Sequence, residues 1–212
     1  MRTIAWRVPP YDNGMYLIYD ERREAILIDP SMGERDALAA VKEHGLVLVE
    51  ILNTHGHPDH IFGNAAVKKA TRARLAIHRL DAYRLGPARP ATTFQIPPCD
   101  ADDLIDEGPL TFVADLKLQA LHTPGHTEGS TCFYSAEESA LFSGDVIFQG
   151  ATGRWDLPGG DREQLERSLE RLMTLPPPTK VYPGHGAPTT IGDELASLRQ
   201  LRVMGVLPGL RV

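Results

Sequence analysis

The sequence predicts an α/β fold, and two observations support this class. Apolar runs of strand length alternate with amphipathic helical patterns from the start of the chain. Several of these runs end at a turn that is followed by a polar side chain. The composition, 42% hydrophobic and 24% charged, is ordinary for a globular protein. At 212 residues the chain can bury a large core, and no linker divides it, so we expect a single domain over residues 1–212.

The first half of the chain predicts a hairpin, a helix and a buried strand. Residues 15–19 and 25–29 are two strands around the polar turn at 20–23. Residues 34–43 follow as an amphipathic helix. The apolar run at 46–52 has the length and composition of a buried strand.

The second half repeats the pattern of a strand followed by a turn. Residues 116–121, 141–146 and 180–182 are strand-like. A helix is expected over 162–174, with Asp161 as its N-cap. The Pro-rich stretch 86–98 is expected to be a loop over the sheet edge, either beside a site or as a solvated connector. The last apolar stretch, 203–212, is expected to pack on the domain or on a second chain, which leaves the oligomeric state open.

The segment after the buried strand is the most informative part of the chain. It reads Thr54-His55-Gly56-His57-Pro58-Asp59-His60. Imidazole is the commonest protein ligand for metals, and nitrogen and oxygen donors without thiolate suit zinc, iron or manganese. This density of donors is difficult to explain by packing, so the segment predicts a metal site.

The local geometry of this segment brings its donors together. His55 and His57 share a parity on an extended chain, and Pro58 keeps His57 extended, so both imidazoles point to the same side. Asp59 and His60 then open a helical pattern. Donors therefore approach from a strand end and from a helix start, and they could hold two metals side by side. An alternative for Asp59 is a simple N-cap of that helix.

Three further polar residues lie at the carboxyl ends of predicted strands. His126 and His185 each follow a Pro-Gly turn, which lets the backbone come close to an ion. Asp145 follows a strand that ends in glycine, and its two oxygens could bridge two cations. Each of the three taken singly is more often a turn or strand-end residue; they become candidates because the histidine-rich segment needs partners.

The other histidines lack this pattern. His44 lies at the end of the predicted helix, where an imidazolium suits the helix dipole. His78 follows a probable strand, and His122 precedes the turn that carries His126. We expect structural roles for all three.

Taken together, these motifs resemble the metallo-β-lactamase superfamily, from about Ile4 to His185. The resemblance implies a fold in which two mixed β-sheets form an αββα sandwich flanked by helices, with the metals at one edge. It also implies that His55, His57 and His126 hold a first metal, that Asp59, His60 and His185 hold a second, and that Asp145 bridges them.

Within the superfamily, the chain is similar to glyoxalase II-like thioester hydrolases. The best-known lactam-hydrolysing class has Cys at the position of Asp145, and the diiron oxygen-reducing members have Glu at that of His57 and a flavin domain. The stretches Thr123–Thr127, Phe142–Asp145 and Gly153–Asp161 match the thioester hydrolases. Two-domain members carry a long helical segment after the last histidine that contacts glutathione, whereas 27 residues follow His185 here. We therefore expect a short, single-domain relative.

The resemblance implies a binuclear hydrolase that cleaves a hydroxyacylglutathione-type thioester with a metal-bridging hydroxide. The cofactors are expected to be two divalent ions, zinc first and iron or manganese as alternatives. Asp59 is the candidate catalytic residue, because it could orient the hydroxide or hold its proton. Arg154 is the candidate for a substrate carboxylate, with an ordinary surface ion pair as the alternative.

Other functions stay open. A persulfide dioxygenase would bind one iron at His55 (or its neighbours), His126 and Asp145. The same hydroxide would also serve another ester, a lactone or a phosphodiester. A non-enzymatic metal-binding module is a further alternative, although none of the ligands is missing.

Composition limits the partners. A formal charge of −6 argues against nucleic acid, and no apolar stretch reaches membrane-spanning length. The partner that the resemblance implies is a small-molecule thioester. The N-terminus shows no apolar signal core, and Cys99 and Cys132 form no paired motif. These features favour a cytoplasmic protein with reduced thiols.

Overall fold

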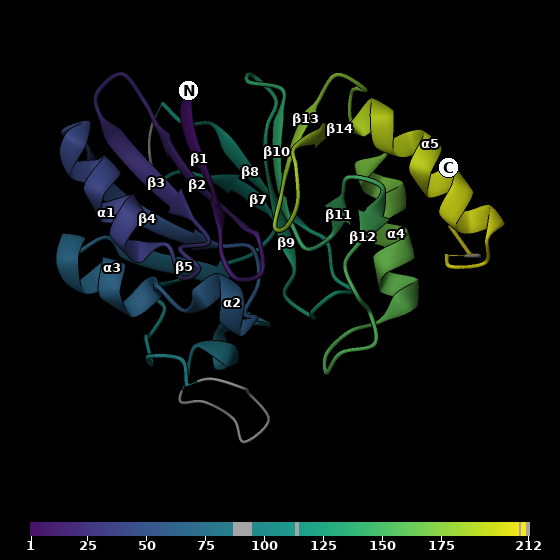
Figure 1. The fold of residues 1–212 in the computed structure, drawn as a ribbon, viewed down its shortest axis with the longest axis horizontal. Helices are drawn as coiled ribbons and strands as arrows, with labels where there is room; N and C mark the ends of the chain where they lie inside the picture. The colour runs from purple at the N-terminus through teal and green to yellow at the C-terminus, as the bar shows by residue number, and fades with distance from the viewer. Residues whose placement is uncertain (87–94, 113–114, 208, 211–212) are drawn as a thin grey trace.

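The chain forms an αββα sandwich in which two β-sheets face each other and helices cover their outer faces (Figure 1). The computed structural model describes residues 1–86, 95–112, 115–207 and 209–210. This arrangement confirms the predicted fold class. Among the described residues, no helix is both long enough and apolar enough to cross a membrane.

The N-terminal sheet has six strands and is mixed. Its three N-terminal strands are antiparallel, and the pairs from β3 to β6 are parallel. In spatial order the strands are β1 (Arg2–Val8), β2 (Asn13–Tyr19), β3 (Glu24–Ile28), β4 (Val47–Asn53), β5 (Arg74–His78) and β6 (Asp103–Ile105).

The C-terminal sheet also has six strands, and β10 pairs in parallel with β13 while the other pairs are antiparallel. In spatial order the strands are β14 (Thr189–Thr190), β13 (Lys180–Pro183), β10 (Ala140–Gly144), β9 (Thr131–Ser135), β8 (Leu118–His122) and β7 (Gly108–Leu110). A small ribbon joins β11 (Ile147–Phe148) to β12 (Ala151–Thr152).

The helices divide between the two outer faces (Figure 1). The N-terminal half contributes α1 (Glu34–Glu43), α2 (Pro58–Ile61), α3 (Asn64–Thr71) and the 3-10 turn η1 (Ala82–Leu85). The C-terminal half contributes α4 (Arg162–Leu172) and α5 (Ile191–Val203). The predicted hairpin and the helices over 34–43 and from 162 are confirmed, and the Asp161 carboxylate caps α4 by accepting from the Gln164 amide.

Three hydrophobic clusters account for the four layers. The first joins α1 and α3 to one face of the N-terminal sheet. The third lies between the two sheets, where Ile26, Ile28 and Leu52 face Phe133 and Phe142. The second joins α4 and α5 to the outer face of the C-terminal sheet. Because residues of both β3 and β4 enter two different clusters, these strands are mostly apolar, as is typical of strands that are buried on both faces.

The structure departs from the expected elements in two places. The helical pattern from Asp59 is divided into α2 and α3, with Gly63 at the break. An ideal Cβ on Gly63 would lie 2.7 Å from the Ser31 carbonyl oxygen, so the close approach there requires glycine. In the C-terminal stretch, Leu207 and Leu210 are buried against the cluster of α4 and α5, whereas Val203, Met204 and Val206 are exposed. Of the predicted loop at 86–98, residues 87–94 lie outside the described part.

The two sheets meet at the edge where the candidate site lies. The Gly14 amide donates to the Gly184 carbonyl at 2.7 Å, and the Tyr16 hydroxyl donates to the Pro183 carbonyl at 2.6 Å. A Cβ on Gly14 would lie 2.2 Å from the Pro183 oxygen, so only glycine lets β2 approach so closely. This contact holds the segment that carries His185 against the N-terminal sheet.

Glu50 predicts a pH-dependent stability. It lies on β4, is 1% exposed, and its Oε1 has no hydrogen-bond partner among the described residues. Burial and the neighbouring charge of Asp103 raise the pKa of Glu50 from 4.5 to about 8. The unfolded chain therefore ionises first as the pH rises, and the folded state loses stability between pH 4.5 and 8, by at most about 1.4 kcal/mol per pH unit.

Glu50→Gln should remove this loss. Urea unfolding of metal-stripped protein should show similar stabilities at pH 4.5 and a growing advantage of the variant towards pH 8. The exposed Glu163→Gln serves as the control. Parallel pH profiles for the wild type and Glu50→Gln would contradict the prediction.

Candidate metal centre

The predicted ligands lie at the ends of four strands that finish at the same edge of the sandwich. His55 and His57 follow β4, and Asp145 follows β10. His126 and His185 lie in the turns after β8 and β13. Asp59 and His60 belong to α2, which begins directly after His57. Ligand sites in open α/β sheets form at the carboxyl ends of strands in the same way.

The first group comprises His55, His57 and His126. One nitrogen from each lies within 4.8 Å of the others. The His57 Nδ1 is 2.8 Å from the His126 Nε2, and the ring of His55 lies 4.8 Å from each of the other two rings. The parity argument for His55 and His57 is therefore confirmed.

The second group comprises Asp59, His60 and His185, whose candidate ligand atoms also lie within 4.8 Å of one another. The His185 Nε2 is 3.3 Å from the His60 Nε2 and 3.4 Å from the Asp59 Oδ2. His57 is the N-cap of α2 and no side chain caps this helix, so the alternative of Asp59 as an N-cap is wrong.

Asp145 lies between the two groups. Its Oδ2 is 3.4 Å from both the His126 Nε2 and the His185 Nε2, and its Oδ1 is 3.4 Å from the His60 Nε2. Gly144 directs the chain here with a φ of 49°, and an ideal Cβ would lie 2.4 Å from the Thr54 hydroxyl. A side chain at position 144 would therefore displace the histidine-bearing segment as well as strain the turn.

Hydrogen bonds on the outer side of the rings assign their tautomers. The Nδ1 of His60 donates to the Asp29 carboxylate at 2.9 Å. The Thr54 hydroxyl donates to Asp29, so it accepts from the Nδ1 of His55 at 3.0 Å. The Nδ1 atoms of His126 and His185 donate to the carbonyls of Arg154 and Tyr11, at 2.7 and 2.8 Å. Each of these four rings therefore directs its Nε2 toward the centre, as metal-ligating histidines do.

This donor set fits divalent cations. The His55 Nε2 is buried and has no hydrogen-bond partner among the described residues. The 2.8 Å contact between nitrogens of His57 and His126 brings lone pairs together unless a proton or a cation lies between them. Five imidazoles and two carboxylates without thiolate are a set that zinc, iron and manganese accept.

Without a cation, the two halves of the site differ in charge. Burial, the neighbouring His126 and other imidazoles lower the pKa of His57 to about 3, and burial keeps the pKa of His55 well below its usual range. Burial opposes protonation of His185 too, but hydrogen bonds to Asp145 and Asp59 raise its pKa to about 10. The first group is thus neutral and ready to bind, whereas a cation at the second group must displace a proton.

Two residues of the site were missed in the sequence. Asp29 is 1% exposed and accepts from the Thr54 amide at 2.8 Å as well as from His60. Its sequence signal was a carboxylate after an apolar strand, the same signal that identified Asp145. The Asn13 amide donates to the Asp59 Oδ2 at 2.9 Å, and no local pattern marked it.

Arg154 and the remaining histidines lie around the centre rather than in it. Arg154 borders the cavity, and its exposed guanidinium makes two hydrogen bonds to Asp156, at 2.8 and 2.9 Å. His44 is the C-cap of α1. His78 and His122 stack with ring centroids 4.1 Å apart, and burial lowers the pKa of His78 to about 4.

A cavity of about 390 Å³ opens over the metal centre. Its floor is made by ligands of both groups together with Asp145, and its walls add apolar and small residues. The residues that line it are His57, Pro58, Asp59, His126, Asp145, Phe148, Thr152, Gly153, Arg154, Leu157 and His185.

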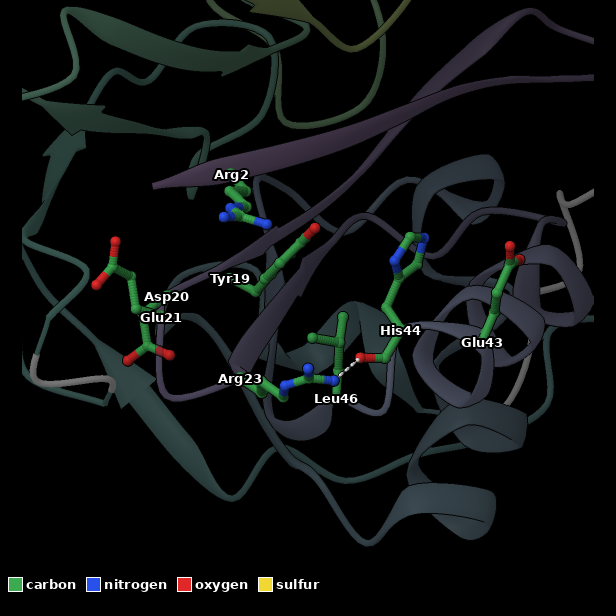
Figure 2. A pocket seen from close by; sticks show the side chains of 8 residues that line it. All are labelled: Arg2, Tyr19, Asp20, Glu21, Arg23, Glu43, His44 and Leu46. Carbon is green, nitrogen blue, oxygen red and sulfur yellow. Dashed lines mark hydrogen bonds between the residues drawn. The ribbon is translucent and has the colours of Figure 1, made fainter.

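A second polar cavity, of about 380 Å³, lies beside the N-terminal sheet, at the end of β3 and β4 opposite to the metal centre (Figure 2). Its lining mixes two arginines with carboxylates, and the Arg23 guanidinium donates to the His44 carbonyl at 2.8 Å. Arginine donates hydrogen bonds but cannot ligate a cation. The cavity over the histidines is therefore the candidate catalytic site.

Comparisons with known proteins agree with this geometry. A family model described as the metallo-beta-lactamase superfamily matches residues 10–185. The hydroxyacylglutathione hydrolase GloC of Haemophilus influenzae is 33% identical, over 90% of this chain and 93% of that protein. The hydroxyacylglutathione hydrolase of Rhodospirillum rubrum is 36% identical over 82% of this chain, but the match spans only 62% of that longer protein.

Two solved structures are also similar. The B3 metallo-beta-lactamase BLEG-1 superposes with a TM-score of 0.87 at 34% identity, over 92% of this chain and 97% of that one. A di-iron-bound form of TTHA1623 superposes with a TM-score of 0.83 at 36% identity, over 92% and 98% of the two chains. The resemblance inferred from the motifs is therefore confirmed.

Asp145→Asn should weaken metal binding, because an amide offers one acceptor oxygen where the carboxylate offers two. We expect at least about a 10-fold loss of affinity and less metal retained after dialysis. Zinc titration by calorimetry and elemental analysis measure both quantities. Asp103→Asn, on a carboxylate that pairs with Arg74 at the surface, is the control. Two zinc ions held at wild-type affinity by Asp145→Asn would contradict the prediction.

Proposed function

The chain belongs to the metallo-beta-lactamase superfamily, and from this membership we propose that it is a metal-dependent hydrolase of hydroxyacylglutathione-type thioesters. The observation that carries the proposal is the position of Asp145, whose carboxylate lies within 3.4 Å of ligands from both groups on the floor of one cavity. The match to GloC, a hydroxyacylglutathione hydrolase, covers 90% of this chain and 93% of that protein and favours a thioester over other electrophiles.

The residues that would hold the cofactor follow from the two groups. His55, His57 and His126 would bind one cation, Asp59, His60 and His185 the other, and Asp145 would contact both. When bound, such a pair supplies a water of lowered pKa and a Lewis acid for the carbonyl oxygen. Zinc is the first expectation, with iron supported by the di-iron-bound structural relative and manganese as a further alternative.

Asp59 is suited to orienting the attacking water. It borders the cavity, and its Oδ2 is held by the Asn13 amide and by His185. Burial opposes ionisation of this carboxyl, but the charge of His60 and hydrogen bonds from His185 and Asn13 lower its pKa below the ordinary range. This carboxylate borders the cavity and is fixed in place by Asn13, so we assign Asp59 the orienting role.

The walls of the cavity suit the rest of the substrate. Phe148 and Leu157 offer apolar surface to the acyl chain, and Arg154 lies where a carboxylate of the substrate can pair with it. A thiol leaving group has a pKa of about 8.5, so it departs as a thiolate without a strong general acid.

A second candidate is hydrolysis of a β-lactam, because a structure described as a B3 metallo-beta-lactamase is so similar to this chain. Single-iron persulfide oxidation is an alternative that uses the same ligands and differs in metal count. The thiol carrier is a separate question, because the chain spans less than two thirds of the Rhodospirillum rubrum hydrolase.

Elemental analysis and substrate turnover test the proposal together. We expect two metals per chain and hydrolysis of S-lactoylglutathione. A colorimetric assay of the released thiol measures this hydrolysis. Nitrocefin tests the lactam alternative, and oxygen uptake on glutathione persulfide tests the iron alternative. Two bound metals with no turnover of any thioester would refute the proposal.

Arg154→Ala should raise KM for a substrate that carries a carboxylate by about 10-fold and change kcat little, because the lost contact is present in both the ground state and the transition state. Asp156→Asn should lower KM, because it frees the guanidinium from its ion pair. Arg167→Ala, on the exposed side of α4, is the control. Unchanged KM values in both Arg154→Ala and Asp156→Asn would remove Arg154 from substrate binding.

A further inference from the structure

Asp81 connects the two loops that carry the first group of histidines. It precedes η1 and is fully buried. Its Oδ2 accepts from the Gly56 amide at 2.7 Å and from the Thr127 hydroxyl at 2.8 Å, and its Oδ1 accepts from the Gly129 amide at 2.9 Å. Gly56 lies between His55 and His57, and Thr127 follows His126.

We propose that Asp81 is a positioning residue that holds these two loops at the separation at which His55, His57 and His126 share one cation. The inference rests on the proposed metal centre and adds to it a residue that touches neither cation nor substrate. Gly56 and Thr127 are 71 residues apart in the chain, and both donate to the same carboxylate oxygen of Asp81.

The fit around Asp81 is specific to the two loops. An ideal Cβ on Gly129 would lie 2.8 Å from the Asp81 Cβ, and one on Gly56 would lie 2.6 Å from the Arg84 Cβ. Each loop thus has a glycine where it packs closely against Asp81 or Arg84. The Arg84 Nε lies 3.4 Å from the Asp81 Oδ1, which places a positive charge beside the buried carboxylate.

The second group of ligands is supported by other residues. Asp29 holds His60, Asn13 holds Asp59, and the Tyr11 carbonyl holds His185. Loss of Asp81 should therefore weaken one cation site and spare the other. A residue that only stabilised the fold would not distinguish between the two.

Asp81→Asn is the direct test, because an amide has one acceptor oxygen and a nitrogen that only donates. The nitrogen would face either the Gly129 amide or the donors of Gly56 and Thr127, so at least one hydrogen bond that holds the loops is replaced by two opposed donors. The control is Asp20→Asn, which alters another buried carboxylate that accepts a backbone amide, from Glu24 at 2.9 Å, and lines the distant cavity of Figure 2.

The experiment titrates metal-stripped full-length protein with cobalt(II), followed by calorimetry and by visible absorption. We expect Asp81→Asn to lose about 10-fold or more affinity at one site, with a changed absorption band, while the other site and Asp20→Asn match the wild type. Wild-type binding at both sites in Asp81→Asn, or an equal loss at both sites, overturns the inference.

Thr127 supplies a second test if Asp81→Asn does not fold. Thr127→Val keeps the shape and removes the hydroxyl that donates to Asp81, whereas Thr127→Ser keeps that donor. We expect weaker cobalt binding at one site in the valine variant and near wild-type binding in the serine variant. Equal affinities of the two variants overturn the inference.

The outcomes separate this inference from the proposed function. A wild-type protein that binds no cobalt(II) would refute the metal centre and the inference with it. A wild-type protein that binds cobalt(II) but hydrolyses no thioester would refute the substrate alone, and the comparison of the Asp81 and Thr127 variants would still stand.

Discussion

Imidazoles and carboxylates that are buried against one another constrain the rest of this structure. Polar groups removed from water are costly unless each has a partner. Here each imidazole with an outer partner turns its other nitrogen toward the remaining ligands, so the inner atoms of the set depend on one another. His55 illustrates the constraint, because Thr54 satisfies its Nδ1 while its Nε2 has no partner among the described residues. A bound cation completes such a set, and folding without one must leave protons or unpaired atoms behind.

The sandwich meets this constraint because residues behind the ligands hold the segments that carry them. Strand ends from both sheets supply the donors, and the contact of Gly14 with Gly184 joins the sheets where those ends meet. Two buried carboxylates, Asp29 and Asp81, then hold the backbone of the histidine-bearing segment on either side of His55. Second partners of this kind set ring orientation and donor strength in metal sites. The packing of the two sheets therefore determines the position of the ligands in the polar centre.

The residues in the wall of the cavity are held by fewer contacts than the residues of its floor. Its floor is held by hydrogen bonds from several elements, whereas Arg154 on its wall is exposed and pairs with Asp156 nearby in sequence. Loops that border a rigid scaffold commonly carry specificity in this way. It is consistent that this chain is about one-third identical to two proteins of different names, a hydroxyacylglutathione hydrolase and a B3 metallo-beta-lactamase.

The sequence alone determined the α/β class, the hairpin, the helices over 34–43 and from 162, and the seven candidate ligands. These depend on local rules: side-chain period, capping by Asp161, and the extended geometry that Pro58 imposes on His57. Only the tertiary structure decided that Asp29, Asn13 and Asp81 support the two groups of ligands, and that α2 and α3 separate at Gly63. Those facts depend on which distant backbone atoms come within hydrogen-bond distance, and no periodicity within one segment carries that information.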